Sequence, residues 1–295
     1  MNKKSKIWKI KTFFVVVHNY IKNIWDNREA FFSKQLEIEN AEKKYKSDVK
    51  EYICQTDSDE FVYYKSNEFP QIFDYTETAG RIDGHYFYQD IFVARLISAF
   101  GVLDVYDIGS RVDGFISHLI SMGIEVTMID IRPLNINLDG LHFAIGNAMD
   151  LHTIKSNSVK ALSCLHALEH FGLGRYGDPI NYNGWKIALN EMIRVVCDKG
   201  RLYLSVPISH TQRVCFNAHR VFDPVTIIDA VGNRMHLIEF HHLAEGRWSS
   251  IQVAASDVKS IIEEINSSQI GLYDLGVFVF EKHLDNHSIF ENRTN

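Results

Sequence analysis

The stretch Tyr106-Asp-Ile-Gly-Ser-Arg-Val-Asp-Gly114 decides the fold, together with Val126-Thr-Met-Ile-Asp130, which follows it along the chain. The two pieces read as a strand, a glycine turn, a helix, a second strand and a terminal acid. This order is typical of the first half of a Rossmann-like nucleotide site: the turn lets the backbone approach the ligand, and the acid accepts hydrogen bonds from ribose hydroxyls. Arg111 stands where a second glycine is expected. The segment therefore indicates a cofactor pocket more firmly than it indicates which cofactor.

Short apolar runs alternate with helical stretches on both sides of this segment. Strands are expected at 105–108, 126–129, 143–145, 159–164, 201–206, 235–241 and 277–282, with helices at 82–100 and 256–265. Alternation of this kind predicts an α/β fold with a mostly parallel, seven-stranded sheet and helices on both faces. The spacing of the last two strands along the chain differs from that of the earlier ones, which favours an antiparallel edge. The expected architecture is the Rossmann-like fold of class I methyltransferases.

Six residues are predicted to bind the cofactor, because the carboxyl ends of parallel strands meet at one crevice. They are Asp107, Gly109, Arg111, Gly114, Asp130 and Asn147. Asp107 would orient either the turn or the ammonium group of the ligand, Asp130 would bind the ribose, and Asn147 would meet the adenine amine. This order matches S-adenosylmethionine sites, whereas NAD would call for G-x-G-x-x-G and the chain has G-x-x-x-x-G. The alternative is that the two glycines only form a tight turn.

Composition narrows the class of partner. The chain has 295 residues and a formal net charge of −6, which argues against a protein that grips nucleic acid through phosphates. A small-molecule or glycan substrate is the better expectation. The four cysteines form no C-x-x-C pair, so reduced thiols in the cytoplasm are expected. No apolar run approaches the ~20 residues of a spanning helix.

The first 25 residues carry six lysines and no acid before Asp26, with apolar residues at helical spacing. This pattern predicts a basic amphipathic helix. It would either lie on the inner face of a membrane as a peripheral anchor or pack on protein. The predicted organisation is an N-terminal amphipathic helix with a helical connector over 1–80 and a methyltransferase-like domain over 81–295.

Four strings carry a resemblance to a known family: 107–115, 130–134, 166–179 and 215–222. Over roughly residues 84–230 the chain resembles domain-of-unknown-function family 268, a bacterial methyltransferase-like family. The resemblance implies the methyltransferase fold and an association with surface-polysaccharide or glycan biosynthesis. It does not imply a particular reaction.

The candidate catalytic residues are His166, Glu169 and His219, which follow the fourth and fifth strands. One hypothesis is that His166, Glu169, His170 and His219 hold a divalent metal, which binds and acidifies vicinal hydroxyls as in metal-dependent RNA 2'-O-methyltransferases. The other is that a neutral histidine, His166 or His219, removes the proton from a hydroxyl without metal. Both remain open at this point.

The glycine-rich segment 172–178 is predicted to cover the pocket. Arg175, Tyr176 and Asp178, with Arg220, are the candidate substrate-binding residues, although an Arg175 to Asp178 ion pair that only pins the loop is as consistent with the sequence. The preferred interpretation is S-adenosylmethionine-dependent O-methylation of a sugar or glycan precursor. The alternatives are an NAD-dependent nucleotide-sugar enzyme and a non-catalytic partner in glycan assembly. The sequence does not indicate an oligomeric state.

Overall fold

A computed structural model describes residues 28, 31–55, 61–80, 82, 84–244, 247–251 and 273–283. The chain forms two compact units, Met1–Arg81 and Ile82–Asn295. The two units meet between Arg81 and Ile82, whereas the sequence prediction placed the boundary between residues 80 and 81. Each unit is described by itself.

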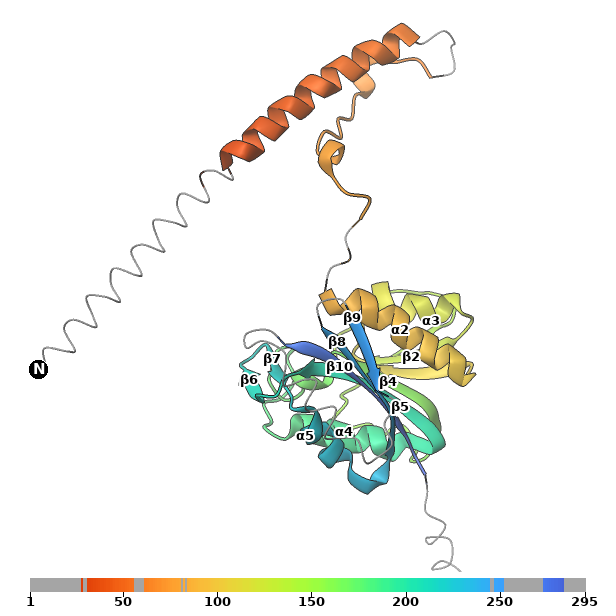
Figure 1. Cartoon of the computed structure of the whole chain (residues 1–295). Coiled ribbons are helices and arrows are strands. Elements are labelled where there is room, and N and C mark those ends of the chain that lie inside the picture. Colours follow the sequence, from red (N-terminus) through yellow and green to blue (C-terminus); the bar gives the residue numbers. More distant parts are fainter. Residues whose placement is uncertain are drawn as a thin grey trace, which may run out of the picture. The chain divides into compact units, whose positions relative to one another are not determined.

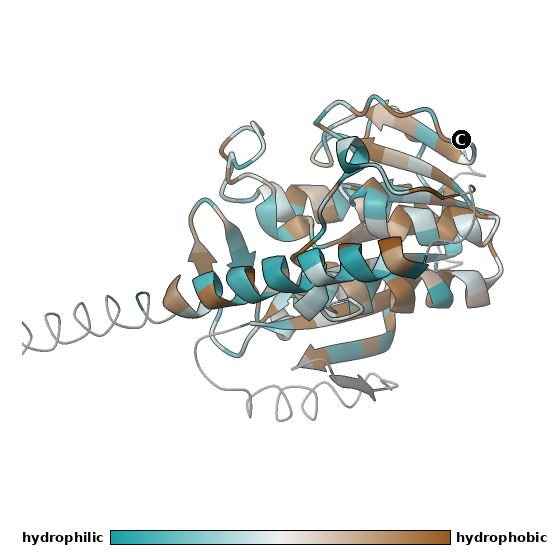
Figure 2. Cartoon of the chain, turned by 90° about the horizontal axis from the view of Figure 1, so that it is seen from above, coloured by the Kyte–Doolittle hydropathy of each residue, from teal (hydrophilic) through white to brown (hydrophobic). Residues whose placement is uncertain are grey.

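The first unit contains a helix at 31–55 and two short 3-10 turns, η1 (Lys65–Asn67) and η2 (Asp74–Thr76). Asp48 joins the helix to the second turn, because its carboxylate accepts hydrogen bonds from Lys44 at 2.7 Å and from the Tyr75 hydroxyl at 2.9 Å. Figure 2 shows this helix as hydrophilic over most of its length and hydrophobic at its ends. None of the helices in the described residues is long and apolar enough to cross a bilayer. The amphipathic helix predicted over residues 1–25 lies outside the described residues.

The second unit is built on an eight-stranded sheet in the order β3-β2-β1-β4-β5-β10-β8-β9 (Figure 1). The strands are β1 (Asp104–Ile108), β2 (Glu125–Asp130), β3 (Leu141–Ile145), β4 (Val159–Leu165), β5 (Val196–Ile208), β8 (His236–Ala244), β9 (Arg247–Ile251) and β10 (Asp274–Glu281). The first five pair in parallel. The predicted class I methyltransferase fold is thus confirmed, with all seven predicted strands present. The chain adds β9 and a separate hairpin of β6 (Arg213–Cys215) and β7 (His219–Val221).

The prediction that the last two predicted strands form an antiparallel part at one edge of the sheet is confirmed, because β8 and β10 pair antiparallel, and the additional strand β9 lies outside them. β10 pairs antiparallel with β5 on one side and with β8 on the other, so it lies inside the sheet. Six consecutive residues of β10, Leu275 to Phe280, are buried, as expected of a strand covered on both faces. The helix predicted at 256–265 lies outside the described residues.

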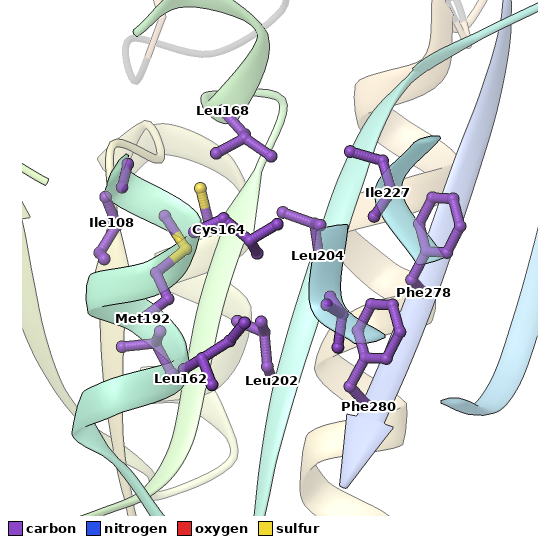
Figure 3. Close-up of a cluster of buried hydrophobic side chains, with 14 of the residues drawn as sticks. Ile108, Leu162, Cys164, Leu168, Met192, Leu202, Leu204, Ile227, Phe278 and Phe280 are labelled. Atoms are coloured by element: carbon purple, nitrogen blue, oxygen red, sulfur yellow. The ribbon is translucent and has the colours of Figure 1, made fainter. Parts of the chain in front are cut away.

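Helices cover both faces of the sheet. The helices α2 (Gly84–Phe100) and α3 (Ser117–Ser121) pack on one face, and α4 (Gly184–Val195) and α5 (Pro224–Val231) on the other (Figure 1). Alternate residues of β4 serve the two faces: Ala161 and Leu165 join the core under α2, while Leu162 and Cys164 join the core under α4. Figure 3 shows the second core, in which Met192 of α4 and Ile227 of α5 lie over β4, β5 and β10.

Candidate functional site

The carboxyl ends of β1, β2, β3 and β4 meet around two adjoining pockets. The inner pocket is lined by residues that end or follow these strands, among them Ile108, Asp130, Asn147 and His166. The outer pocket is lined by α2, by the turn after β1 and by the loop after β4. The two pockets share Gly109, Arg132, His166 and Tyr176. The predicted crevice is therefore one continuous site with two compartments.

Both glycines of the turn are required by close contacts. Gly109 has a φ of +78°, and a Cβ added there would stand 2.9 Å from the Cβ of Ala167. Gly114 lies in the turn η3 (Val112–Ile116) against α2, where an added Cβ would collide with the Asp90 carboxylate. A larger residue at Gly109 would press on Ala167 in the wall of the inner pocket, and one at Gly114 would move the Asp90 side chain in the wall of the outer pocket.

Asp107 lies beneath the turn and lines neither pocket. Its carboxylate is fully buried and accepts hydrogen bonds from the Ser110 hydroxyl (2.8 Å), the Ser110 amide (3.1 Å) and the Ser163 hydroxyl (2.7 Å). Burial raises the pKa of Asp107 to about 6 against these hydrogen bonds. Of the two predicted roles, the geometry corresponds to orienting the turn.

Arg111 and Asp113 lie at the open rim of the outer pocket. The Arg111 guanidinium binds the Asp113 carboxylate through two hydrogen bonds of 2.9 and 2.6 Å, and both side chains are largely exposed. The arginine at the expected position of the second glycine thus lies in the wall of the outer pocket and is paired with Asp113.

Asp130 ends β2 and lines the inner pocket, where its side chain is bonded to Arg132. Its two oxygens accept from the Arg132 guanidinium at 2.9 and 2.5 Å, and one also accepts from the Arg132 amide at 2.8 Å. The Arg132 guanidinium in turn stacks over the Tyr176 ring, 4.6 Å from its centroid. Asp130 stands where a ribose-binding acid is expected, and its carboxylate is bonded to Arg132, which lines the same pocket.

Asn147 follows β3 and also lines the inner pocket. Its side-chain oxygen accepts a hydrogen bond of 2.9 Å from the Met149 amide, which closes a tight turn. The carbonyl keeps a second lone pair and the amide nitrogen two protons for a ligand.

His166 and Glu169 form a buried pair at the junction of the two pockets. His166 has a φ of +50°, which is uncommon for a residue with a side chain. Its Nδ1 lies 2.8 Å from Glu169 Oε1, and neither residue exposes more than a tenth of its surface. In the neutral tautomer whose Nδ1–H donates to Glu169, the lone pair of the ring lies on Nε2, an atom that is itself buried. Neither His166 Nε2 nor Glu169 Oε2 has a hydrogen-bond partner among the described residues.

The loop after this pair packs over it. His170 Nδ1 lies 2.7 Å from the carbonyl of Ala218, to which Arg175 also donates at 2.8 Å, and burial lowers the pKa of His170. Asp178 accepts from the Gly172 amide at 2.7 Å and from the Tyr176 amide at 3.4 Å. Asp178 therefore holds the loop through hydrogen bonds to its backbone. The ion pair between Arg175 and Asp178 that the sequence also allowed is not what holds it.

His219 lies on β7, and its ring centroid is 5.0 Å from that of Tyr273. Burial lowers the pKa of His219, and the charge of Glu169 opposes that shift. Within the described part of the chain, however, no three His, Cys, Asp or Glu side chains are arranged to hold a metal ion. The structure thus gives no support to the metal site predicted from His166, Glu169, His170 and His219.

Arg220 lies away from both pockets. Its guanidinium donates to the carbonyls of Phe171 (2.7 Å), Glu169 (3.3 Å) and Tyr182 (3.4 Å). Through these bonds Arg220 supports the loop that follows β4, and its contact with substrate stays a prediction.

The sequence reasoning missed the contribution of α2. Its first turns bring Tyr86, Gln89 and Asp90 to the outer pocket, and the Tyr86 ring lies 5.0 Å from that of His166. Burial raises the pKa of both Tyr86 and Asp90. The spacing of four residues between Tyr86 and Asp90 was the available signal, because it places both on one side of a helix.

Comparisons with known proteins find one family profile and a set of solved structures. Residues 147–264 match the profile of a family described as Caenorhabditis protein of unknown function, DUF268. No curated protein matches the chain. Similar solved structures include the N-methyltransferase NodS from Bradyrhizobium japonicum WM9 with S-adenosyl-L-homocysteine, at 13% identity and a TM-score of 0.46 over 66% of this chain and 86% of that one. A SAM dependent methyltransferase from Archaeoglobus fulgidus is 18% identical, with a TM-score of 0.44 over 68% of this chain and 95% of that one.

Proposed function

We propose that this chain is an S-adenosylmethionine-dependent methyltransferase. The observation that carries the proposal is the pair of pockets joined at Gly109, His166 and Tyr176, with a buried histidine facing both. A cofactor with an adenosine part and an amino-acid part needs two compartments joined by a narrow backbone turn. The apolar walls of the inner pocket and the acid of Asp130 suit the chemistry of adenosine, but the inner pocket has a volume of about 50 Å³ and would have to widen to admit it; the polar outer pocket, about 680 Å³, suits the rest of the cofactor.

Named residues would hold the cofactor in this arrangement. Asp130 would accept from the ribose hydroxyls, Asn147 would meet the adenine edge, and Gly109 would let the backbone approach. When bound, S-adenosylmethionine supplies the methyl group and retains the electron pair of the broken carbon–sulfur bond. Arg132 would have to share Asp130 with the ribose or move aside.

We infer that His166 removes the proton of the acceptor. Its Nε2 lone pair lacks a partner, and Glu169 holds the opposite nitrogen in the protonated form and would stabilise the imidazolium that results. An acceptor hydroxyl would give its proton to Nε2 while its oxygen forms the bond to the methyl carbon. Alignment supplies most of the remaining advantage.

A sugar or surface-glycan precursor on the cytoplasmic side is the acceptor we propose. The outer pocket combines the rings of Tyr86 and Tyr176 with the charged groups of Asp90 and Arg175. Aromatic faces and directed polar groups are what a polyhydroxylated ring requires. Residues 1–25 would bring the enzyme to the membrane surface if they form the predicted anchor.

Calorimetric titration with S-adenosylhomocysteine tests the proposal. We expect binding in the micromolar range, and Asp130→Ala should weaken it by about tenfold, roughly the value of one charge-assisted hydrogen bond. Asp104→Ala is the matched control, because Asp104 is an exposed acid at the opposite end of β1. Binding of NAD in place of S-adenosylhomocysteine would favour the NAD-dependent alternative, and binding of neither would favour a non-catalytic partner.

A further inference from the structure

A third pocket lies between the start of α4, the β6–β7 hairpin and α5. It shares no lining residue with the inner or outer pocket, and its volume is about 270 Å³. Pockets for whole cofactors are usually larger, ~300 to 1,000 Å³. The space suits a ligand group about the size of one sugar ring. We call it the basic pocket, after Lys186, Arg213 and Arg220.

The charge of the basic pocket is unbalanced. Three cationic side chains line it, and the described lining includes no carboxylate, in a chain whose net charge is −6. The arginines bond to backbone carbonyls: Arg213 to Thr211 at 3.1 Å, and Arg220 to Phe171 at 2.7 Å. Burial lowers the pKa of Arg220, and the charge of Asp178 opposes that shift. An anion would supply the missing charge.

Aromatic rings form the remaining wall. Trp185 is almost fully buried beside Phe222, with ring centroids 5.2 Å apart, while Tyr182 is 86% exposed at the rim. The Lys186 ammonium lies 5.3 Å from the Trp185 ring centroid, within cation–π range. An exposed aromatic rim beside cations suits an apolar ring face that carries a negative substituent.

We propose that the basic pocket binds an anionic sugar, with its phosphate or carboxylate on Lys186 and Arg213 and its ring against Tyr182. Both oxyanions accept paired hydrogen bonds from guanidinium groups. Arg220 connects this pocket to the proposed methyl-transfer site, because it donates a hydrogen bond to the carbonyl of Phe171, and Phe171 lines the inner pocket. Binding in the basic pocket does not depend on methyl transfer.

Calorimetry on the full chain with glucose 1-phosphate, glucuronic acid and glucose tests the proposal and separates the two anions. We expect at least one anionic sugar to bind about tenfold or more tightly than glucose, with affinity that falls as salt rises. Lys186→Ala and Arg213→Ala should each weaken binding about three- to tenfold. Lys155→Ala is the control, because Lys155 is an exposed lysine that precedes the amino end of β4.

Two results would overturn the proposal: no preference for either anionic sugar over glucose, or binding that both variants leave unchanged. A titration of the same samples with S-adenosylhomocysteine keeps the two proposals apart. If the wild-type chain binds S-adenosylhomocysteine but neither anionic sugar, the basic pocket alone is contradicted. The reverse result would contradict the methyltransferase proposal alone.

Discussion

Asp107 makes the stability of the fold depend on pH. Its pKa is about 6 in the folded protein and 3.8 as a free side chain, and burial is the main cause. Between these values the folded protein holds a proton that the unfolded chain has released, so the free energy of unfolding falls as pH rises toward 6. We expect the wild type to lose about 1 kcal/mol more than Asp107→Asn between pH 5 and 7 in urea unfolding. Equal slopes for the two proteins would contradict this, and Asp104→Asn controls for surface charge.

At the residue scale, the sequence located the acids and glycines but not their partners. Asp130 ends one strand and Asn147 follows the next, and parallel strands end at one edge, so their convergence follows from the pattern alone. The hydrogen bonds that Asp130 makes with Arg132 depend on side-chain conformations that spacing does not specify. The contribution of Tyr86 and Asp90 depends on how α2 packs, which is a tertiary property.

At the scale of elements, β10 holds the sheet together between β5 and β8. Phe278 is fully buried, and its ring centroid lies 4.9 Å from that of Phe240 on β8. Phe278→Ala should lower the free energy of unfolding by about 3–5 kcal/mol, because it leaves a cavity in the core. Phe216→Ala, at a side chain that is 73% exposed, should change it by less than about 0.5 kcal/mol. Similar values for the two variants in denaturant unfolding would argue against this placement of β10.

The strands themselves were predictable because each is a short apolar run between turn residues. The position of β10 was not, because strand order is decided by long-range pairing and leaves no trace in the local sequence. β9 was missed because its segment, RWSSI, contains two serines and no apolar run, and β6 and β7 were missed because each has only three residues. Such short runs show little periodicity.

At the scale of the whole molecule, both hydrophobic cores consist of residues from the second unit. A chain of residues 82–295 should therefore fold alone, with a Tm within about 2 °C of that of the full protein, since domains with their own core fold independently. Its affinity for S-adenosylhomocysteine should match that of the full chain. Thermal unfolding and calorimetry check both points. A much lower Tm would show that residues 1–81 stabilise the second unit.

The position of β10 also has a consequence for biosynthesis. Ribosomes deliver the strands in sequence order, and β8 reaches the solvent before β10, the strand that must lie between it and β5. The first five strands can pair as they emerge, whereas β8 has no partner on its inner side until residues 274–281 have left the exit tunnel. Until then the nascent chain exposes an open edge at β5, and the pair of β8 and β9 is not joined to the rest of the sheet. We expect this interval to be the one in which the growing protein depends most on chaperones.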